Sequence, residues 1–305
     1  MLENLDLQLL KARDEAELDR LSQAVREVGF LKIIHTGISA ARVMQVIEMY
    51  RAFFVLPEAT KSAVDMARTG SNRGWGGGQS EQVDPKANPD YKQVFDCGYE
   101  LSPDHPVHAR NLSVYATNLW PDAPKGFREE IQLYFHEASA VAMEVLRAIA
   151  HVVGQDAAAF DAAFDPPMAL LRGNYYPERP AWAGARDFGI AAHTDYGCLT
   201  LLATDGVPGL EVKRADGTWD AVTTQPGEFV INFGEMLEFW TAGQVKATEH
   251  RVVGSADERL SVPLFFNPSY DTNVAPPGSG EVITAGAHLT RRYDETYVHL
   301  QNQNA

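Results

Sequence analysis

The stretch "IAAHTDYGCLTLLA", residues 190–203, places a histidine and an aspartate two positions apart, directly before a short apolar run. Such a run, bounded by turn residues, is typical of a β-strand. Side chains two positions apart on a strand point to the same face, so His193 and Asp195 can direct an imidazole nitrogen and a carboxylate oxygen at one point. A pair this short also recurs by chance, and either residue alone is usually a surface group or a satisfied polar group. The pair therefore predicts a metal site only if other residues support it.

The rest of the second half consists of similar short runs separated by turn residues, including "MALLRGNYYP", "GEFVINF" and "RLSVPLFFNP". Many short strands at this spacing indicate a sandwich or jelly roll. In the first half, apolar residues recur at spacings of three and four over 16–30, 41–56 and 127–154, which predicts helices. A segment rich in Gly, Asn and Pro, 69–90, is predicted to be a long loop.

These patterns predict an α+β protein with a mainly β core, a sandwich or jelly roll, buttressed by N-terminal and mid-chain helices. We expect residues 1–110 to form an N-terminal helical and β region of that fold. Residues 111–305 are expected to add the mid-chain helix and the catalytic jelly-roll core, all within one compact unit. No internal repeat and no sharp change of composition marks a linker.

Composition excludes some partners for this chain of 305 residues. Acidic residues outnumber Lys and Arg 41 to 26, for a net charge of −15, which argues against nucleic-acid binding. No apolar run approaches the ~20 residues of a membrane span, and acidic residues occupy the start, where a signal peptide carries basic ones. The two cysteines, Cys97 and Cys198, suit a reducing compartment. We therefore expect a cytoplasmic protein without a membrane partner.

A third metal ligand is expected from a neighbouring strand, because two ligands do not hold a metal firmly. His250, in "ATEHRVVG", begins another β run, and the 55 residues after Asp195 are enough for the chain to cross to the opposite sheet and return. Two histidines and one carboxylate occupy one face of an octahedral metal and leave three positions free. This arrangement is the one expected of non-haem iron(II) oxygenases.

The segment "ERLSVPLFFNP" adds a second pattern. Arg259 and Ser261 are again two positions apart on a predicted strand, among apolar neighbours. A buried arginine needs an anionic partner, and its guanidinium binds a carboxylate bidentately while a serine hydroxyl adds a donor. A dicarboxylate co-substrate meets that need. An internal ion pair with Asp257 or another acid would meet it equally well.

Ordered motifs along nearly the whole chain resemble those of the iron(II)- and 2-oxoglutarate-dependent dioxygenases. The resemblance is to the branch shared by isopenicillin N synthase and the plant flavonoid and ethylene-forming oxygenases. Its motifs in the first half are "GFLKIIHTGI", "FFVLPEATK", "RGW" and "DYKQVFDCG". In the second half they are "NYYPE", "HTDYGCLTLL", "GLEV", "PGEFVINFGEMLEFWTAG", "HRVV" and "RLSVPLFFNP", in the family's order and approximate spacing. One departure is Glu235, where relatives usually carry Asp.

The resemblance implies that the β core is a double-stranded β-helix (jelly roll). It also implies an oxidoreductase with iron(II) and O2, and with 2-oxoglutarate as co-substrate. Oxidative decarboxylation of 2-oxoglutarate would be coupled to hydroxylation, desaturation or cyclisation of a small organic substrate. The iron ligands implied are His193, Asp195 and His250, and the pair implied for the distal carboxylate of 2-oxoglutarate is Arg259 and Ser261. Matching residues that contact or orient the co-substrate in relatives are Asn174 and Tyr176.

Several side chains are candidates for the substrate pocket. They are Phe188, Tyr196, Leu199 and Phe266 in the second half, with Arg73 and Trp75 from the Gly-rich segment. Pockets of this kind are mostly apolar, although each of these residues could equally belong to the ordinary core or surface. The C-terminal segment "HLTRRYDETYVHL" is predicted to be a helix that closes over the site or mediates dimerisation.

Two other functions remain open. One is an oxidase of the isopenicillin N synthase or aminocyclopropane-carboxylate oxidase kind, which works without 2-oxoglutarate. The other is a non-catalytic jelly-roll binding protein. Dependence on the co-substrate separates the first from the dioxygenase, and an intact ligand set disfavours the second.

Overall fold

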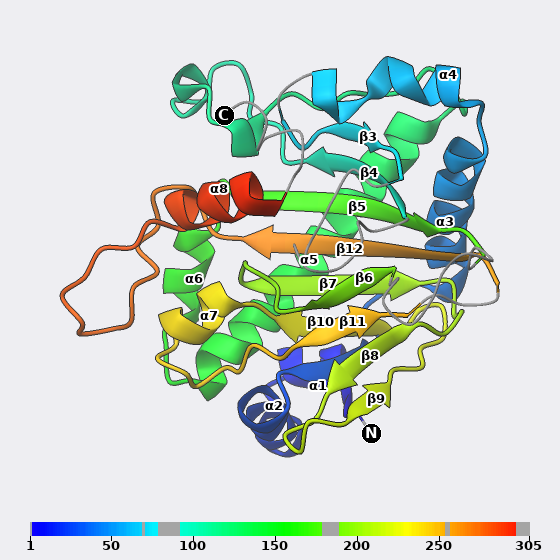
Figure 1. The fold of residues 1–305 in the computed structure, drawn as a ribbon. Coiled ribbons are helices and arrows are strands. Elements are labelled where there is room, and N and C mark those ends of the chain that lie inside the picture. Colours follow the sequence, from blue (N-terminus) through cyan, green and yellow to red (C-terminus); the bar gives the residue numbers. More distant parts are fainter. Residues whose placement is uncertain (1, 69–70, 79–91, 179–188, 254–256, 297–305) are drawn as a thin grey trace.

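The structure, a computed structural model, describes residues 2–68, 71–78, 92–178, 189–253 and 257–296. Two sheets dominate it (Figure 1). The large sheet has the order β1-β2-β10-β7-β12-β5-β4-β3, and only its β1–β2 pair is parallel. Its strands are β1 (Asn4–Asp6), β2 (Phe30–Ile34), β10 (Phe229–Phe233), β7 (Leu199–Thr204), β12 (Arg259–Asn267), β5 (Met168–Tyr176), β4 (Gln93–Gly98) and β3 (Gly74–Gly76).

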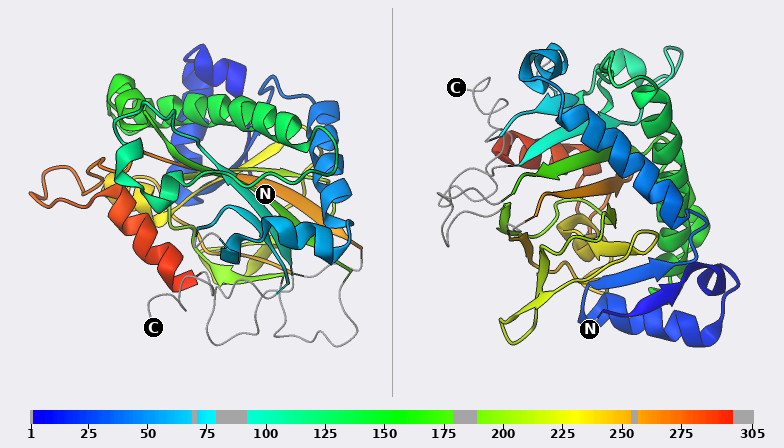
Figure 2. Two further views of the ribbon diagram at one scale, coloured as in Figure 1. Left: turned by 90° about the horizontal axis from the view of Figure 1, so that it is seen from above. Right: turned by 90° about the vertical axis from the view of Figure 1, so that its right-hand side faces the viewer.

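The small sheet has the order β6-β11-β8-β9 and lies against the large sheet on the side away from the long helices (Figure 2). Its strands are β6 (Ile190–His193), β11 (His250–Val252), β8 (Leu210–Lys213) and β9 (Trp219–Ala221). The facing sheets form the jelly-roll core, which confirms the predicted fold class.

Eight α-helices occur in the described ranges: α1 (Leu7–Lys11), α2 (Glu15–Glu27), α3 (Ala40–Phe54), α4 (Glu58–Lys61), α5 (Phe127–Val152), α6 (Ala157–Ala163), α7 (Glu235–Trp240) and α8 (Ala285–Thr296). Short 3₁₀ turns lie at Ser62–Val64, Met66–Arg68, His108–Arg110 and Ser113–Tyr115. Helices α3 and α5 pack on the outer face of the large sheet (Figure 2). No helix in the described segments combines the length and apolarity of a membrane span.

The predicted helices are present, and their ends have local causes. The helix predicted over 16–30 ends at Glu27, because Gly29 adopts a φ of +70° and a Cβ there would lie 2.2 Å from the Lys246 carbonyl oxygen. The predicted loop 69–90 is wrong in part, since Gly74–Gly76 pairs with β4 as the edge strand β3. Much of that segment lies outside the described residues.

The apolar core behind the site depends on a close contact between α3 and β5. A Cβ at Gly173 would lie 2.3 Å from the Tyr50 ring, so only glycine lets this ring lie against the strand. Tyr50 and Phe53 also pack against Phe95 and Phe127, which ties α3 and α5 to the sheet. The rigid layer behind β5 leaves its opposite face free to line the space between the sheets. The proposed boundary at residue 110 stays a prediction. Strands β4 and β5, which come from its two sides, are neighbours in one sheet.

Candidate active site

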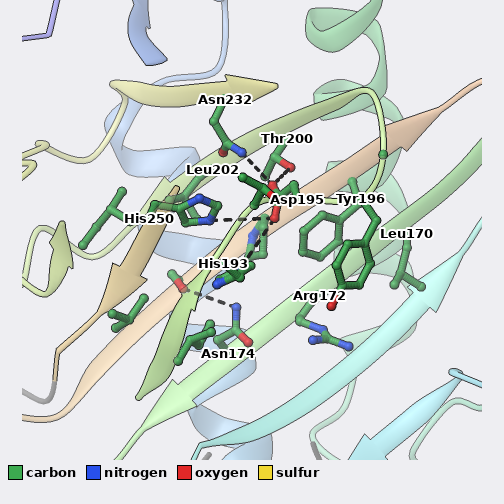
Figure 3. Close-up of a pocket in the computed structure, with 18 of the residues that line it drawn as sticks. Leu170, Arg172, Asn174, His193, Asp195, Tyr196, Thr200, Leu202, Asn232 and His250 are labelled. Atoms are coloured by element: carbon green, nitrogen blue, oxygen red, sulfur yellow. Dashed lines mark hydrogen bonds and ion pairs between the residues drawn. The ribbon is translucent and has the colours of Figure 1, made fainter. Parts of the chain in front are cut away.

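Three potential metal ligands converge between the two sheets. His193 ends β6, His250 begins β11, and the two residues are directly opposite each other in the antiparallel ladder. Asp195 follows β6, and its Oδ1 lies 3.7 Å from Nε2 of each histidine. One ligand atom from each residue lies within 4.8 Å of the others, a separation that a single ion can bridge (Figure 3). The cross-strand pairing thus brings together ligands that are far apart in sequence.

Both histidines are oriented by backbone carbonyls. Nδ1 of His193 donates to the Ala191 carbonyl at 2.8 Å, and Nδ1 of His250 lies 3.3 Å from the Thr248 carbonyl. Because a carbonyl oxygen only accepts, these bonds place the proton on Nδ1 and leave the Nε2 lone pair for a metal. Burial and the neighbouring imidazole lower the pKa of His250, which keeps its ring neutral and able to ligate.

The carboxylate of Asp195 is held through its other oxygen. Oδ2 accepts a bond of 2.6 Å from Nδ2 of Asn232 on β10 and a short bond from Oγ1 of Thr200 on β7. Burial raises the pKa of Asp195, but the two imidazoles and these two donors outweigh burial and lower it overall. Asp195 is therefore ionised, and its Oδ1 faces the histidines.

The ligand set opens into a cavity of about 140 Å³ between the sheets and α8. Strands β5 and β12 supply one wall with alternate side chains, as expected for residues that share one face of a strand. The wall residues on these strands are Leu170, Arg172, Asn174, Tyr176, Arg259, Ser261, Pro263, Phe265 and Asn267. Further lining comes from Lys92, Tyr196, Leu199, Leu202, Leu289 and Tyr293, among others.

One end of the cavity is suited to a carboxylate. Arg259 is 2% exposed, its Nε donates to the Val207 carbonyl at 3.1 Å, and its guanidinium lies 5.0 Å from the centre of the Tyr176 ring. Its Nη1 is buried without a hydrogen-bond partner among the described residues. Ser261 lies two residues further along β12, opposite Asn174, whose Nδ2 lies 3.5 Å from the serine Oγ. A buried cation with an unsatisfied donor matches an anionic ligand rather than an internal ion pair.

The sequence-predicted pocket residues fall into three groups. Tyr196 and Leu199 line the cavity, whereas Phe188 lies outside the described residues. Trp75 is buried in the core with its Nε1 bonded to Gln93. Arg73 is also buried and donates to the Val114 carbonyl, and it lines a small neighbouring cavity together with Leu170 and Tyr293. The expectation that these two side chains line the pocket is therefore wrong.

The expectation for Phe266 is also wrong. This side chain is 3% exposed and stacks on Phe164, with ring centroids 5.1 Å apart, on the core side of β12. Its neighbour Phe265 lines the cavity instead, because it shares the alternation of Arg259 and Ser261. That alternation was a usable sequence signal for Phe265.

Several other residues of the site were not predicted from the sequence. Arg172 points into the pocket (Figure 3), and Asp96, directly opposite on β4, binds its Nε at 2.8 Å and its Nη2 at 2.6 Å. Leu289 and Tyr293 reach the cavity from α8, and Asn232 supports Asp195. Alternation along "LLRGNYY" would have paired Arg172 with Asn174 and Tyr176. No local sequence pattern indicated Leu289, Tyr293 or Asn232.

Comparisons with known proteins agree with this geometry. A family model described as "non-haem dioxygenase in morphine synthesis N-terminal" matches residues 2–123, and one for the 2OG-Fe(II) oxygenase superfamily matches residues 167–268. The 2-oxoglutarate-Fe(II) type oxidoreductase hxnY of Emericella nidulans is 32% identical over 278 residues, 88% of this chain and 79% of that protein. Homoarginine-6-hydroxylase 2-ODD-233 of Oryza sativa subsp. japonica is 32% identical over 295 residues, 91% of this chain and 88% of that protein.

Solved structures are similar over almost the full length. A full-length protein of Neurospora crassa, crystallised in complex with α-ketoglutarate (2-oxoglutarate), superposes with a TM-score of 0.84 at 28% identity, covering 96% of both chains. The same protein in complex with α-ketoglutarate and thymine gives a TM-score of 0.82 at 27% identity, again covering 96% of both chains.

Proposed function

Because the chain belongs to the 2OG-Fe(II) oxygenase superfamily, we propose that His193, Asp195 and His250 hold its iron(II). The enzyme couples oxidative decarboxylation of 2-oxoglutarate to oxidation of a small organic substrate. When bound, iron(II), O2 and 2-oxoglutarate supply the oxidant that removes hydrogen from a substrate carbon, with release of succinate and CO2. The protein contributes ligands, orientation and a pocket that excludes water.

The observation that carries 2-oxoglutarate dependence is the buried Nη1 of Arg259. No carboxylate among the described residues pairs with this guanidinium, so its charge is compensated only when an anion binds. In the proposal, the distal carboxylate of 2-oxoglutarate takes that place, with Ser261 as a second donor. Tyr176 supports the guanidinium through its ring, and Asn174 lies beside the serine hydroxyl. These contacts set the direction in which the keto acid extends toward the metal ligands.

The far side of the cavity supports a proposal for the substrate. Tyr196, Phe265 and Tyr293 provide aromatic surfaces, and Arg172 provides a polar group held in place by Asp96. Aromatic walls favour planar groups, and a guanidinium favours an oxygen acceptor. We therefore propose a compact substrate with a planar, carbonyl-bearing part. The binding of thymine by the similar Neurospora crassa protein supports this class and does not identify the molecule.

We further propose that the protein belongs to the isopenicillin N synthase-like branch and that it is cytoplasmic. The branch is supported by the order of motifs along the chain. A reducing compartment is supported by Cys97 and Cys198, which are both free and buried.

The test is anaerobic titration of the iron(II)-loaded protein with 2-oxoglutarate, following the visible charge-transfer band of the chelate. Arg259→Met should weaken 2-oxoglutarate binding on the order of a hundredfold, because it removes the buried partner of a charge. The control is Arg251→Met, since Arg251 pairs with Glu211 and stacks on Trp219 outside the cavity. Equal affinity in the Arg259 variant would contradict the assignment. Absence of the band with iron bound would favour the 2-oxoglutarate-independent oxidase.

A further inference from the structure

Helix α8 carries two neighbouring stripes of side chains with different roles. Leu289 and Tyr293, four residues apart, line the cavity. His288 and Arg292, also four residues apart, contact the segment that bears the metal ligand Asp195 instead. One side of the helix therefore forms part of the pocket wall, and the adjacent side contacts the segment that bears Asp195. Figure 1 shows α8 beside one end of β5 and β12.

The contacts of the second stripe are specific. His288 Nε2 lies 2.9 Å from the Tyr196 carbonyl oxygen, and the Arg292 guanidinium lies 4.1 Å from the centre of the Tyr196 ring. Nη2 of Arg292 also lies 3.2 Å from Oε1 of Glu235, the first residue of α7. Two side chains of α8, His288 and Arg292, thus hold the helix to Tyr196, the residue after Asp195, and to Glu235.

Glu235 links this contact to the ligand segment a second time. Its Oε1 accepts a bond of 2.7 Å from Oγ1 of Thr194, and its backbone N–H donates to the Asp195 carbonyl at 2.8 Å. One carboxylate oxygen therefore serves both Arg292 and the residue between His193 and Asp195.

We propose that the Arg292–Glu235 ion pair, with Arg292 stacked on Tyr196, is a clamp that positions α8 as a wall of the substrate pocket. This inference rests on the proposed function, because it concerns the substrate side of the same cavity. Arg292 and Glu235 are positioning residues, and Leu289 and Tyr293 are the side chains they place against the substrate. The clamp leaves the 2-oxoglutarate end, around Arg259, untouched.

The first test is amide hydrogen exchange over residues 285–293 in the anaerobic enzyme loaded with iron(II) and 2-oxoglutarate. Arg292→Met should accelerate this exchange about five- to tenfold, as expected for a partly exposed ion pair plus a cation–π contact. Arg291→Met is the matched control, because Arg291 is the exposed neighbour on the same helix. Glu235→Gln should accelerate exchange in the same region, and adding it to Arg292→Met should have little further effect. Arg292→Lys should restore part of the protection.

The second test reports on the wall itself. Leu289→Cys places a thiol in the cavity lining, and both native cysteines are buried and free. A thiol reagent should modify this residue faster in the Arg292→Met background than in the Arg291→Met background. Exchange and labelling indistinguishable from those of the Arg291→Met control would overturn the clamp. So would accelerated exchange spread evenly over the protein. The charge-transfer band with 2-oxoglutarate should persist in every variant, and its loss in the wild type would instead contradict the proposed function.

Discussion

Nδ2 of Asn232 donates a hydrogen bond of 2.6 Å to Oδ2 of Asp195, so that Oδ1 is the oxygen directed at both histidines. Thr200 donates to the same Oδ2. The carboxylate is thus oriented before a metal binds, and its direction depends on β7 and β10, the strands that carry these donors.

Thr200→Val should lower iron(II) affinity roughly ten- to hundredfold, because supporting residues of metal ligands typically contribute that much. The measurement is anaerobic iron(II) titration of the metal-free protein. Thr204→Val is the control on the same strand, since Thr204 bonds Thr224 and not Asp195. Loss of affinity in both variants would show a general effect of β7 rather than support of the ligand.

Tyr176→Leu should weaken 2-oxoglutarate binding roughly three- to tenfold, the effect of a partly desolvated cation–π contact with Arg259. Tyr176→Phe keeps the ring and should retain the affinity. Both are measured by the anaerobic titration described above. Equal losses in the two variants would assign the role to the hydroxyl instead.

Phe265 and Phe266 are neighbours on β12 with opposite roles. Phe266→Ala should destabilise the fold by about 3–5 kcal/mol, because a buried aromatic side chain is removed from the core. Phe265→Ala should leave stability nearly unchanged and reduce substrate-stimulated succinate release. Urea unfolding and a succinate assay with screened compounds measure the two effects. The reverse pattern would show that the register of β12 is shifted by one residue.

Asp96→Ala should destabilise the protein by about 3–5 kcal/mol, because it removes the carboxylate that binds two nitrogens of the buried Arg172. Asp271→Ala, which breaks the exposed pair with Arg110, should change stability little. Urea unfolding of both variants provides the comparison. A small effect at Asp96 would mean that water compensates the guanidinium.

Cys97 and Cys198 should not react with a chromogenic thiol reagent at pH 7 in the folded protein. Burial raises the pKa of both thiols, so the reactive thiolate is scarce, and it also blocks access. Unfolding in urea should expose both groups and restore their ordinary reactivity. Rapid labelling of the native protein would contradict the buried placement of one of them.

The spacing of side chains along single strands and helices was enough to predict much of this site from the sequence. The two-residue period of a strand put His193 with Asp195 and Arg259 with Ser261, and the helical period placed α3 and α5 within a few residues of their ends. Applied consistently, the same period would have selected Phe265 over Phe266 and included Arg172. Both residues therefore carry a local signal in the sequence.

Only the tertiary structure decided which distant residues meet. The pairing of His193 with His250, the bond from Asn232 to Asp195 and the approach of Leu289 and Tyr293 from α8 depend on strand order and helix docking. The burial of Arg73 and Trp75 has the same origin. A side chain's own neighbours along the chain set the face it occupies, whereas the packing of whole elements sets what that face meets.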